Sequence, residues 1–276
     1  MINPIHFGHP ERQLFGIYHT PRGTAAQPTR SVLICPPFGQ EYIRSHWCLR
    51  LLAGQLARKG MHVLRFDYWG IGDSFGEPID VQSLEQWQQD IETAKTWLKN
   101  RTGAASCMLV GLGTGAGLAV RQSQFCDDVN SLVLWEPVSD GERWLEKRRK
   151  MHREMLDMWV CRMNSPNDET AEEMLGSIYS KALLDDLNQT LIDWDAVDLP
   201  HLVVDLEEQR ENYATANPMR KVVFTDDENS WDDLRQLETA WLRPQTVRKI
   251  VNHADEVFDR LVRFGALVDP QFEVTQ

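Results

Sequence analysis

The sequence lacks the features that place a chain in a membrane or on a nucleic acid. No apolar run approaches the length of a membrane span, and the N-terminus has no basic segment followed by an apolar stretch. Basic residues are few, 29 against 41 acidic residues, and the net charge of −12 argues against binding to nucleic acid or to an anionic membrane. We expect a soluble, cytoplasmic protein.

The cysteines likewise lack any pattern of pairing. They are five in number, scattered, and without a C-x-x-C pair. This indicates neither a disulfide framework nor a zinc site, and we expect no metal ion and no cofactor. Internal repeats and low-complexity tracts are also missing, so the 276 residues can form one large α/β domain with an insertion, or two small domains.

Short apolar runs alternate with helical patterns along most of the chain. The runs predict strands over residues 12–20, 31–35, 62–67, 105–110, 131–135, 201–205 and 221–225. Helices are predicted over residues 46–59, from Ser83 to about 98, after the glycines at 111–117 to about 124, and over 245–264. Ser83 and Gln86 form a capping box for the second of these helices. The alternation predicts an α/β fold, a mostly parallel sheet with helices on both faces.

Residues 140–194 interrupt this alternation. They are charged and rich in methionine, and their pattern is helical. Because strands resume afterwards, we interpret this segment as an inserted helical cap, and residues 1–139 and 195–276 as the core. A cap in this position would cover the mouth of a site at the sheet edge.

Glycines fill the sharp turn that follows the predicted strand 105–110. The frame Gly111-x-Gly113-x-Gly115 keeps glycine at its centre, where no side-chain oxygen or sulfur is available as a nucleophile. Three glycines at a helix N-terminus leave backbone N–H groups and the positive end of the helix dipole, which suit a carboxylate, phosphate or sulfate group. The turn therefore predicts a pocket for a small ligand, or for a protein partner.

The order of three motifs resembles the α/β-hydrolase superfamily, of serine aminopeptidase and esterase type. Residues 37–39, Pro-Phe-Gly, follow the first buried strand, and residues 67–74 read D-x-x-G-x-G-x-S after the next. The glycine turn then stands where the superfamily has its nucleophile elbow, G-x-S-x-G. The resemblance implies an α/β-hydrolase fold in which Gly113 has replaced the nucleophile.

A closer resemblance points to the type 2 exosortase-A-associated hydrolases, encoded in bacteria beside exopolysaccharide genes. Residues 37–41, 44–45, 70–74 and 132–138 carry it. In that group the centre of the elbow is often not serine, so the resemblance implies a catalytically reduced protein linked to exopolysaccharide production. A shared fold does not imply a shared reaction.

An acyl-transfer site also needs oxyanion donors, a carboxylate and a base. The superfamily pattern places the oxyanion donors at the N–H groups of Phe38, with Gly39 beside it, and of Thr114. Glu208 is the candidate carboxylate, and the structural alternative is that it belongs to a solvated acidic loop. His253 is the candidate base because it is the only histidine late in the sequence, although it lies in a helical pattern.

Two further features admit a functional and a structural interpretation. His46 lies close to the predicted oxyanion loop and either faces the pocket or occupies the first turn of a helix. Basic residues at 147–150 and 153 either meet an anionic partner or form a solvated helix face, and the solvated face is the favoured interpretation.

Two alternative functions remain at this point. One is an active esterase, thioesterase or acyltransferase with an unconventional nucleophile, for which Thr114 supplies the nearest hydroxyl. The other is a dinucleotide-binding protein, because Gly111-x-Gly113-x-x-Ala116 follows a strand and Glu136 ends the next one. In that fingerprint the glycines belong after the first strand, whereas here two buried strands precede them.

Overall fold

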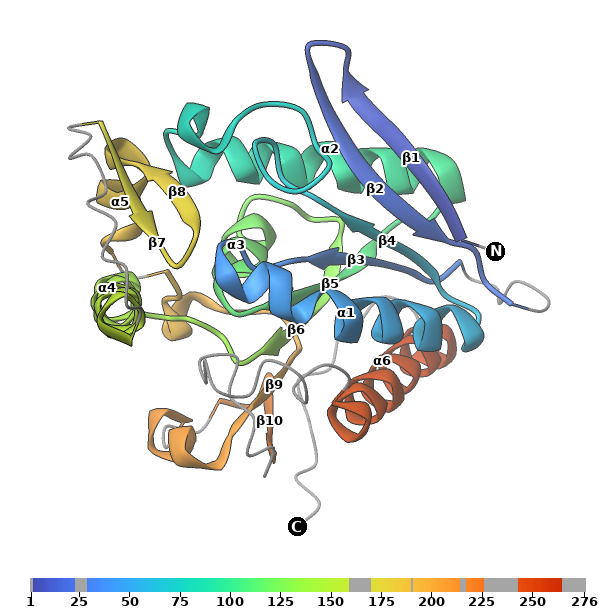
Figure 1. Cartoon of the computed structure of the whole chain (residues 1–276). Coiled ribbons are helices and arrows are strands. Elements are labelled where there is room, and N and C mark those ends of the chain that lie inside the picture. Colours follow the sequence, from blue (N-terminus) through green and yellow to red (C-terminus); the bar gives the residue numbers. More distant parts are fainter. Residues whose placement is uncertain are drawn as a thin grey trace.

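The computed structural model describes residues 2–22, 29–158, 170–189, 191–213, 217–225 and 243–264. Within them, helices cover both faces of an eight-stranded sheet (Figure 1). Its strands are β1 (Ile2–His9), β2 (Arg12–His19), β3 (Ser31–Cys35), β4 (His62–Phe66), β5 (Cys107–Leu112), β6 (Val129–Trp135), β9 (His201–Leu206) and β10 (Arg220–Thr225). The helices are α1 (Gln40–Arg58), α2 (Leu84–Thr102), α3 (Thr114–Ser123), α4 (Gly141–Met158), α5 (Lys181–Leu187) and α6 (Pro244–Phe264).

The strand order is β1-β2-β4-β3-β5-β6-β9-β10. β1 and β2 form an antiparallel hairpin, and β2 is antiparallel to β4. All other neighbours are parallel. The mostly parallel sheet, with helices α1, α2 and α3 between the successive strands β3, β4, β5 and β6, confirms the predicted fold class.

Two helix layers bury the centre of the sheet. Every residue of β3 and β5 is buried, as expected for parallel strands covered on both faces. On one face α1 and α6 lie side by side, with Leu52 and Ile250 in the same apolar cluster (Figure 1). On the other face α2 and α3 contribute Ile91 and Leu118 to a second cluster. The loops that follow the parallel strands therefore meet at one edge, where such folds place their sites.

Two elements differ from the sequence prediction near the N-terminus. β1 was not predicted, because it is an edge strand with few buried residues and contains Pro4 and Gly8. Helix α1 begins at Gln40 rather than near residue 46. The leucine spacing marks only its buried middle, whereas its polar first turn follows Gly39, whose φ is 66°. This early start carries Glu41 to the carboxyl edge of the sheet.

The sequence predicts a helical segment between β6 and β9, but the structure shows that this segment is not wholly helical. Between α4 and α5 it contains the antiparallel strands β7 (Ala171–Met174) and β8 (Ser177–Ser180). Leu175 and Gly176 join them with φ values of 54° and 81°, as a two-residue type I′ turn requires. Leucine is an unusual residue at positive φ, so this hairpin has no recognisable turn signal in the sequence.

Candidate functional site

Gly113 forms the predicted sharp turn between β5 and α3. Its φ and ψ are 56° and −122°, and its N–H donates to the carbonyl oxygen of Trp135 at 2.9 Å. Its carbonyl oxygen accepts hydrogen bonds from the N–H groups of Ala116 and Val138, both at 3.1 Å. The elbow geometry is therefore intact although its centre carries no side chain.

The side chain of Glu41 fills the space beside this glycine. A Cβ placed on Gly113 would lie 2.6 Å from Oε2 of Glu41 and 3.5 Å from Cβ of Pro37. Glu41 is only 6 % exposed, in the first turn of α1. Its carboxylate thus lies at the N-terminus of α3, where the helix dipole favours a negative charge. The anion that the glycine turn predicts is supplied by the chain itself.

Two side chains of helix α4 hold the Glu41 carboxylate from the other side. Oε1 accepts a hydrogen bond from Nε1 of Trp144 at 3.1 Å and forms an ion pair with Arg148. The side chains of Glu41 and Arg148 are 7 % and 5 % exposed, so the pair is buried. We call these three residues the elbow plug. It connects the sheet edge to the inserted segment.

The favoured interpretation of the basic cluster as a solvated face is wrong for Arg148. Lys150 does lie on an exposed face, with its side chain 72 % exposed. Arg149 forms a two-bonded ion pair with Glu172 of β7, both bonds at 2.8 Å. The sequence could not separate these neighbours, because only the packing of α4 decides which of them points inward.

The predicted oxyanion residues do come together, but they are bonded to each other. The N–H of Phe38 donates to Oγ1 of Thr114 at 3.3 Å, inside the protein. Thr114 is 1 % exposed. Gly39 follows with positive φ, and the hydroxyl of Tyr179 occupies the space where its Cβ would be. The hydroxyl of Thr114 therefore satisfies the donor that an oxyanion would need.

Glu208 lies exposed in the 3₁₀ helix Glu207–Tyr213 that follows β9. The buried carboxylate at this place is Asp205, which accepts hydrogen bonds from the Tyr213 hydroxyl at 2.5 Å and the Leu206 N–H at 2.8 Å. Burial raises the pKa of Asp205 above its usual range, although these two hydrogen bonds lower it. Asp205 is thus engaged with its own loop, and the sequence prediction did not single it out.

His253 lies in the middle of α6, about 14 Å along the axis from the first residue of that helix. Asp255, two residues on, bonds at 3.1 Å to Arg30, which precedes the amino end of β3. Gly113 follows the carboxyl end of β5, which is parallel to β3. The structure therefore does not place His253 beside the elbow.

The environment of His253 is apolar and cationic. The histidine is 6 % exposed, and its Nδ1 has no hydrogen-bond partner among the described residues. Burial, with smaller contributions from Lys221 and Arg260, lowers its pKa to about 3. A catalytic base is oriented by a third group, commonly a carboxylate. In the described part of the chain no carboxylate orients the His253 ring.

A second buried ion pair lies just beyond the elbow. Glu136, directly after β6, has a φ of 43° and pairs with Arg243, which precedes α6. Their side chains are 11 % and 3 % exposed. Glu136 is the acid that a dinucleotide site would use for a ribose, but here its carboxylate binds a guanidinium.

His46 is exposed and borders a cavity of about 30 Å³ with Arg65 and Asp67.

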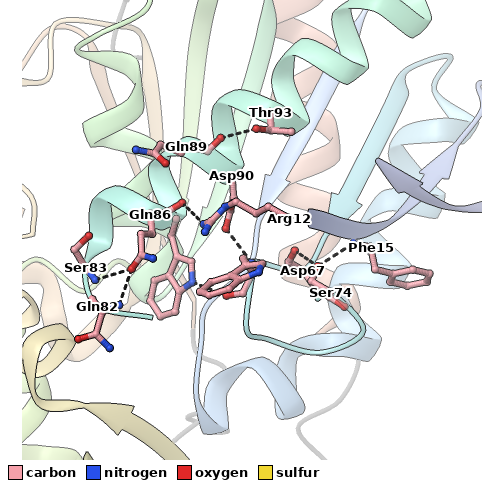
Figure 2. A network of polar contacts seen from close by, with 12 residues as sticks. Arg12, Phe15, Asp67, Ser74, Gln82, Ser83, Gln86, Gln89, Asp90 and Thr93 are labelled. Carbon is pink, nitrogen blue, oxygen red and sulfur yellow. Dashed lines mark hydrogen bonds and ion pairs between the residues drawn. The ribbon is translucent and has the colours of Figure 1, made fainter. Parts of the chain in front are cut away.

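The D-x-x-G-x-G-x-S turn is built as a rigid loop. Ser74 Oγ donates to the carbonyl oxygen of Asp67 at 2.6 Å and accepts from the N–H of Phe15 at 2.8 Å (Figure 2). The carboxylate of Asp67 accepts from the Tyr42 hydroxyl at 2.8 Å and the Asp73 N–H at 3.1 Å. Asp67 therefore fixes the turn to α1.

A network of charged groups ties the same turn to helix α2. Asp90, which faces Arg12 in Figure 2, accepts from Nε and Nη2 of Arg12 at 3.1 and 2.9 Å. It also accepts from the N–H of Trp69 at 2.9 Å. Nη2 of Arg12 also donates to the carbonyl oxygen of Gln86 at 2.9 Å (Figure 2). The guanidinium lies 4.6 Å from the centre of the Trp69 ring. The turn is thus anchored on two sides.

A cavity of about 280 Å³ opens beside this turn. Its walls are residues 70–72, the start of α1, part of α2, the β7–β8 hairpin and the start of α5.

Within the described ranges there is no group of His, Cys, Asp and Glu that could hold a metal ion. No helix in that same part of the chain is long and apolar enough to cross a bilayer.

Comparisons with known proteins agree with this architecture. The family model described as Serine aminopeptidase, S33, matches residues 26–219. The human protein ABHD12B is 29% identical over 115 residues, which are 40% of this chain and 26% of that protein. The chain thus spans about a quarter of the length of this relative.

Solved structures show the same fold at low sequence identity. Est1E from Butyrivibrio proteoclasticus, solved with ferulic acid, has a TM-score of 0.64 and 13% identity, with 94% of this chain and 99% of that chain covered. A proline iminopeptidase from Mycobacterium smegmatis has a TM-score of 0.59 and 13% identity, over 92% and 98% of the two chains. Together with the family match, the strand order and the elbow show that the chain belongs to the serine aminopeptidase S33 family of the α/β-hydrolase superfamily.

Proposed function

We propose that this chain is a catalytically reduced α/β-hydrolase-fold protein that binds a small molecule rather than cleaving an ester. One observation carries the loss of catalysis in this proposal: the carboxylate of Glu41 lies in the space in which the elbow nucleophile of a serine hydrolase would stand. The cavity of about 280 Å³ beside the D-x-x-G-x-G-x-S turn leaves room for a small molecule. The buried elbow plug, Glu41 with Trp144 and Arg148, keeps it there. The elbow then serves as a contact between the sheet and the inserted segment.

The chemistry that remains around Gly113 supports this proposal. Thr114 carries the nearest hydroxyl, but that hydroxyl is buried and bonded to the Phe38 N–H. A nucleophilic hydroxyl needs a base within hydrogen-bond reach, and the sequence has no histidine between β10 and α6. His253 lies toward the amino edge of the sheet, and Glu208 is exposed.

A panel of hydrolase substrates tests the proposal. We expect the wild-type protein to hydrolyse p-nitrophenyl acetate, p-nitrophenyl butyrate and an acyl thioester no faster than the buffer blank. Thr114→Val and His253→Gln should leave this result unchanged. Turnover by the wild type that is lost in Thr114→Val would instead establish the alternative, an active enzyme with an unconventional nucleophile.

The link to bacterial exopolysaccharide production remains a prediction from the resemblance to the type 2 exosortase-A-associated hydrolases. It is compatible with a binding protein, because an accessory role needs no turnover. Deletion of the gene in a producing strain, followed by measurement of secreted polysaccharide, tests it. Complementation with the Thr114→Val variant should then restore the wild-type amount.

A further inference from the structure

The cavity beside the D-x-x-G-x-G-x-S turn is separate from the elbow. Its lining includes Gly39 but not Gly113, Thr114 or Glu41. The hydroxyl of Tyr179 lies over Gly39, and its ring packs edge-on against Trp144 of the elbow plug, with 6.5 Å between the ring centres. With about 280 Å³, the cavity lies just below the usual range of small-molecule pockets, about 300–1,000 Å³.

The lining of the cavity is apolar and carries no charged side chain. Ile71 comes from the turn, Trp87 from α2, and Leu183 from α5. Trp87 donates its single N–H to the carbonyl oxygen of Trp69 at 3.1 Å, so its ring offers only carbon surface to a ligand. Such walls favour apolar groups, at roughly 25 cal/mol for each Å² removed from water.

The hydroxyl of Tyr42 in the lining already has a partner within the protein. It donates to the Asp67 carboxylate at 2.8 Å. An anion in this cavity would meet no cationic side chain of the lining and would lie near the Asp67 carboxylate. Burying an unpaired charge is strongly unfavourable, so the lining selects against anions.

The mouth of the cavity extends this apolar surface to the solvent. Ile43 of α1 and Ile178 of β8 both line the cavity, and they remain 66 % and 49 % exposed. Exposed apolar side chains grouped at the mouth of a cavity are typical of ligand-binding grooves. They come from the core and from the inserted hairpin, so a ligand at the mouth would touch both.

We infer that this cavity binds a neutral, largely apolar small molecule, such as a medium-chain alcohol or ester, which enters between Ile43 and Ile178. The inference rests on the proposed binding function and specifies the ligand class and the place. The apolar part of the ligand contacts Trp87 and Ile71. Its polar end stays at the rim, where water can reach it.

A fluorescence titration with the full chain tests this inference. The neutral dye N-phenyl-1-naphthylamine should bind saturably, with one site per chain. 1-Octanol should displace the dye, and octanoate, which has the same chain length and a negative charge, should need at least tenfold higher concentration. Equal displacement by octanoate, or the lack of saturable dye binding, would overturn the inference.

Two matched variants locate the site. Ile178→Asp places a charge at the exposed mouth without touching the core, and we expect it to weaken dye binding at least tenfold. Phe125→Asp makes the same kind of change at another exposed residue, 76 % exposed at the end of α3 and outside the lining, and should bind the dye as the wild type does. Unchanged binding in Ile178→Asp, or equal loss in both variants, contradicts the assignment.

A neutral ester, methyl octanoate, tested for dye displacement and for hydrolysis, separates this inference from the proposed function. If the wild type binds methyl octanoate and also hydrolyses it, the proposed loss of catalysis is wrong while the cavity assignment stands. If the ester is neither bound nor cleaved, the cavity assignment fails and the filled elbow is untouched.

Discussion

Replacing Gly113 by alanine tests whether Glu41 occupies the place of the nucleophile. The substitution puts a Cβ on a backbone with φ of 56° and ψ of −122°, a conformation that costs an L-residue about 1–3 kcal/mol. The same Cβ would lie 2.6 Å from Oε2 of Glu41. The carboxylate would have to move away from Trp144 and Arg148, and breaking a buried ion pair costs about 3–5 kcal/mol. We expect a loss of unfolding free energy of about 3 kcal/mol or more.

Urea unfolding followed by tryptophan fluorescence measures this loss, and the ten tryptophans supply the signal. Gly103→Ala is the control for a left-handed backbone, because Gly103 has a φ of 70° and no atom within 4 Å of its Cβ position. Its cost should be about 1–2 kcal/mol.

A double-mutant cycle separates the contact from the backbone strain. In the background Glu41→Ala/Arg148→Met, which removes the carboxylate and its partner together, Gly113→Ala should cost only the strain, about 1–3 kcal/mol. An equal cost of Gly113→Ala in both backgrounds would refute the filled elbow.

Three further predictions follow from the buried charges. Arg148→Met should destabilise the protein by about 3–5 kcal/mol in urea unfolding, and adding Glu41→Gln should recover part of the loss, because a buried carboxylate no longer stands alone; a greater loss in the double variant contradicts the plug. Asp90→Ala should cost about 2–3 kcal/mol, less than a fully buried pair because the Arg12 side chain is 28 % exposed; a change below about 0.5 kcal/mol, the size usual for surface substitutions, would show that the Arg12 network is dispensable. Burial lowers the pKa of His253 to about 3, so the unfolded chain takes up the proton first as the pH falls. The free energy of unfolding should therefore decrease between about pH 6.5 and pH 3, by about 1.4 kcal/mol per pH unit. The free energy of unfolding of His253→Leu should depend less on pH over this window, and an unchanged slope would contradict the buried, neutral histidine.

Local patterns in the sequence predicted most of the sheet and the elbow. The apolar run at Ser31–Cys35 was predicted with its exact bounds, and Ser83 caps α2 as its spacing with Gln86 indicates. Phe38 and Thr114 lie close together, but the Phe38 N–H donates to the Thr114 side chain. These features depend on neighbours along the chain or on the regular geometry of parallel strands.

The elbow plug could not be predicted in the same way. Glu41 precedes the leucine pattern that reveals α1, and its role depends on where that helix begins. Arg148 stands in a run of basic residues, and only the packing of α4 turns it inward. The contact joins residues 107 positions apart. The glycine at the centre of the elbow showed that the nucleophilic side chain is missing. Only the tertiary structure shows that the Glu41 side chain fills its space.

Turnover of p-nitrophenyl butyrate by Gly113→Ser/Glu41→Ala tests most directly whether the hydrolytic machinery is gone. This double variant restores the elbow hydroxyl and removes the carboxylate that would collide with it. Because no histidine of the described residues has been placed beside the elbow, we predict a rate equal to that of the buffer blank and of Gly113→Ala/Glu41→Ala. Circular dichroism should show that both variants are folded. Saturable turnover by the serine variant alone would contradict this prediction, because it would show that a base and an oxyanion site still face the elbow.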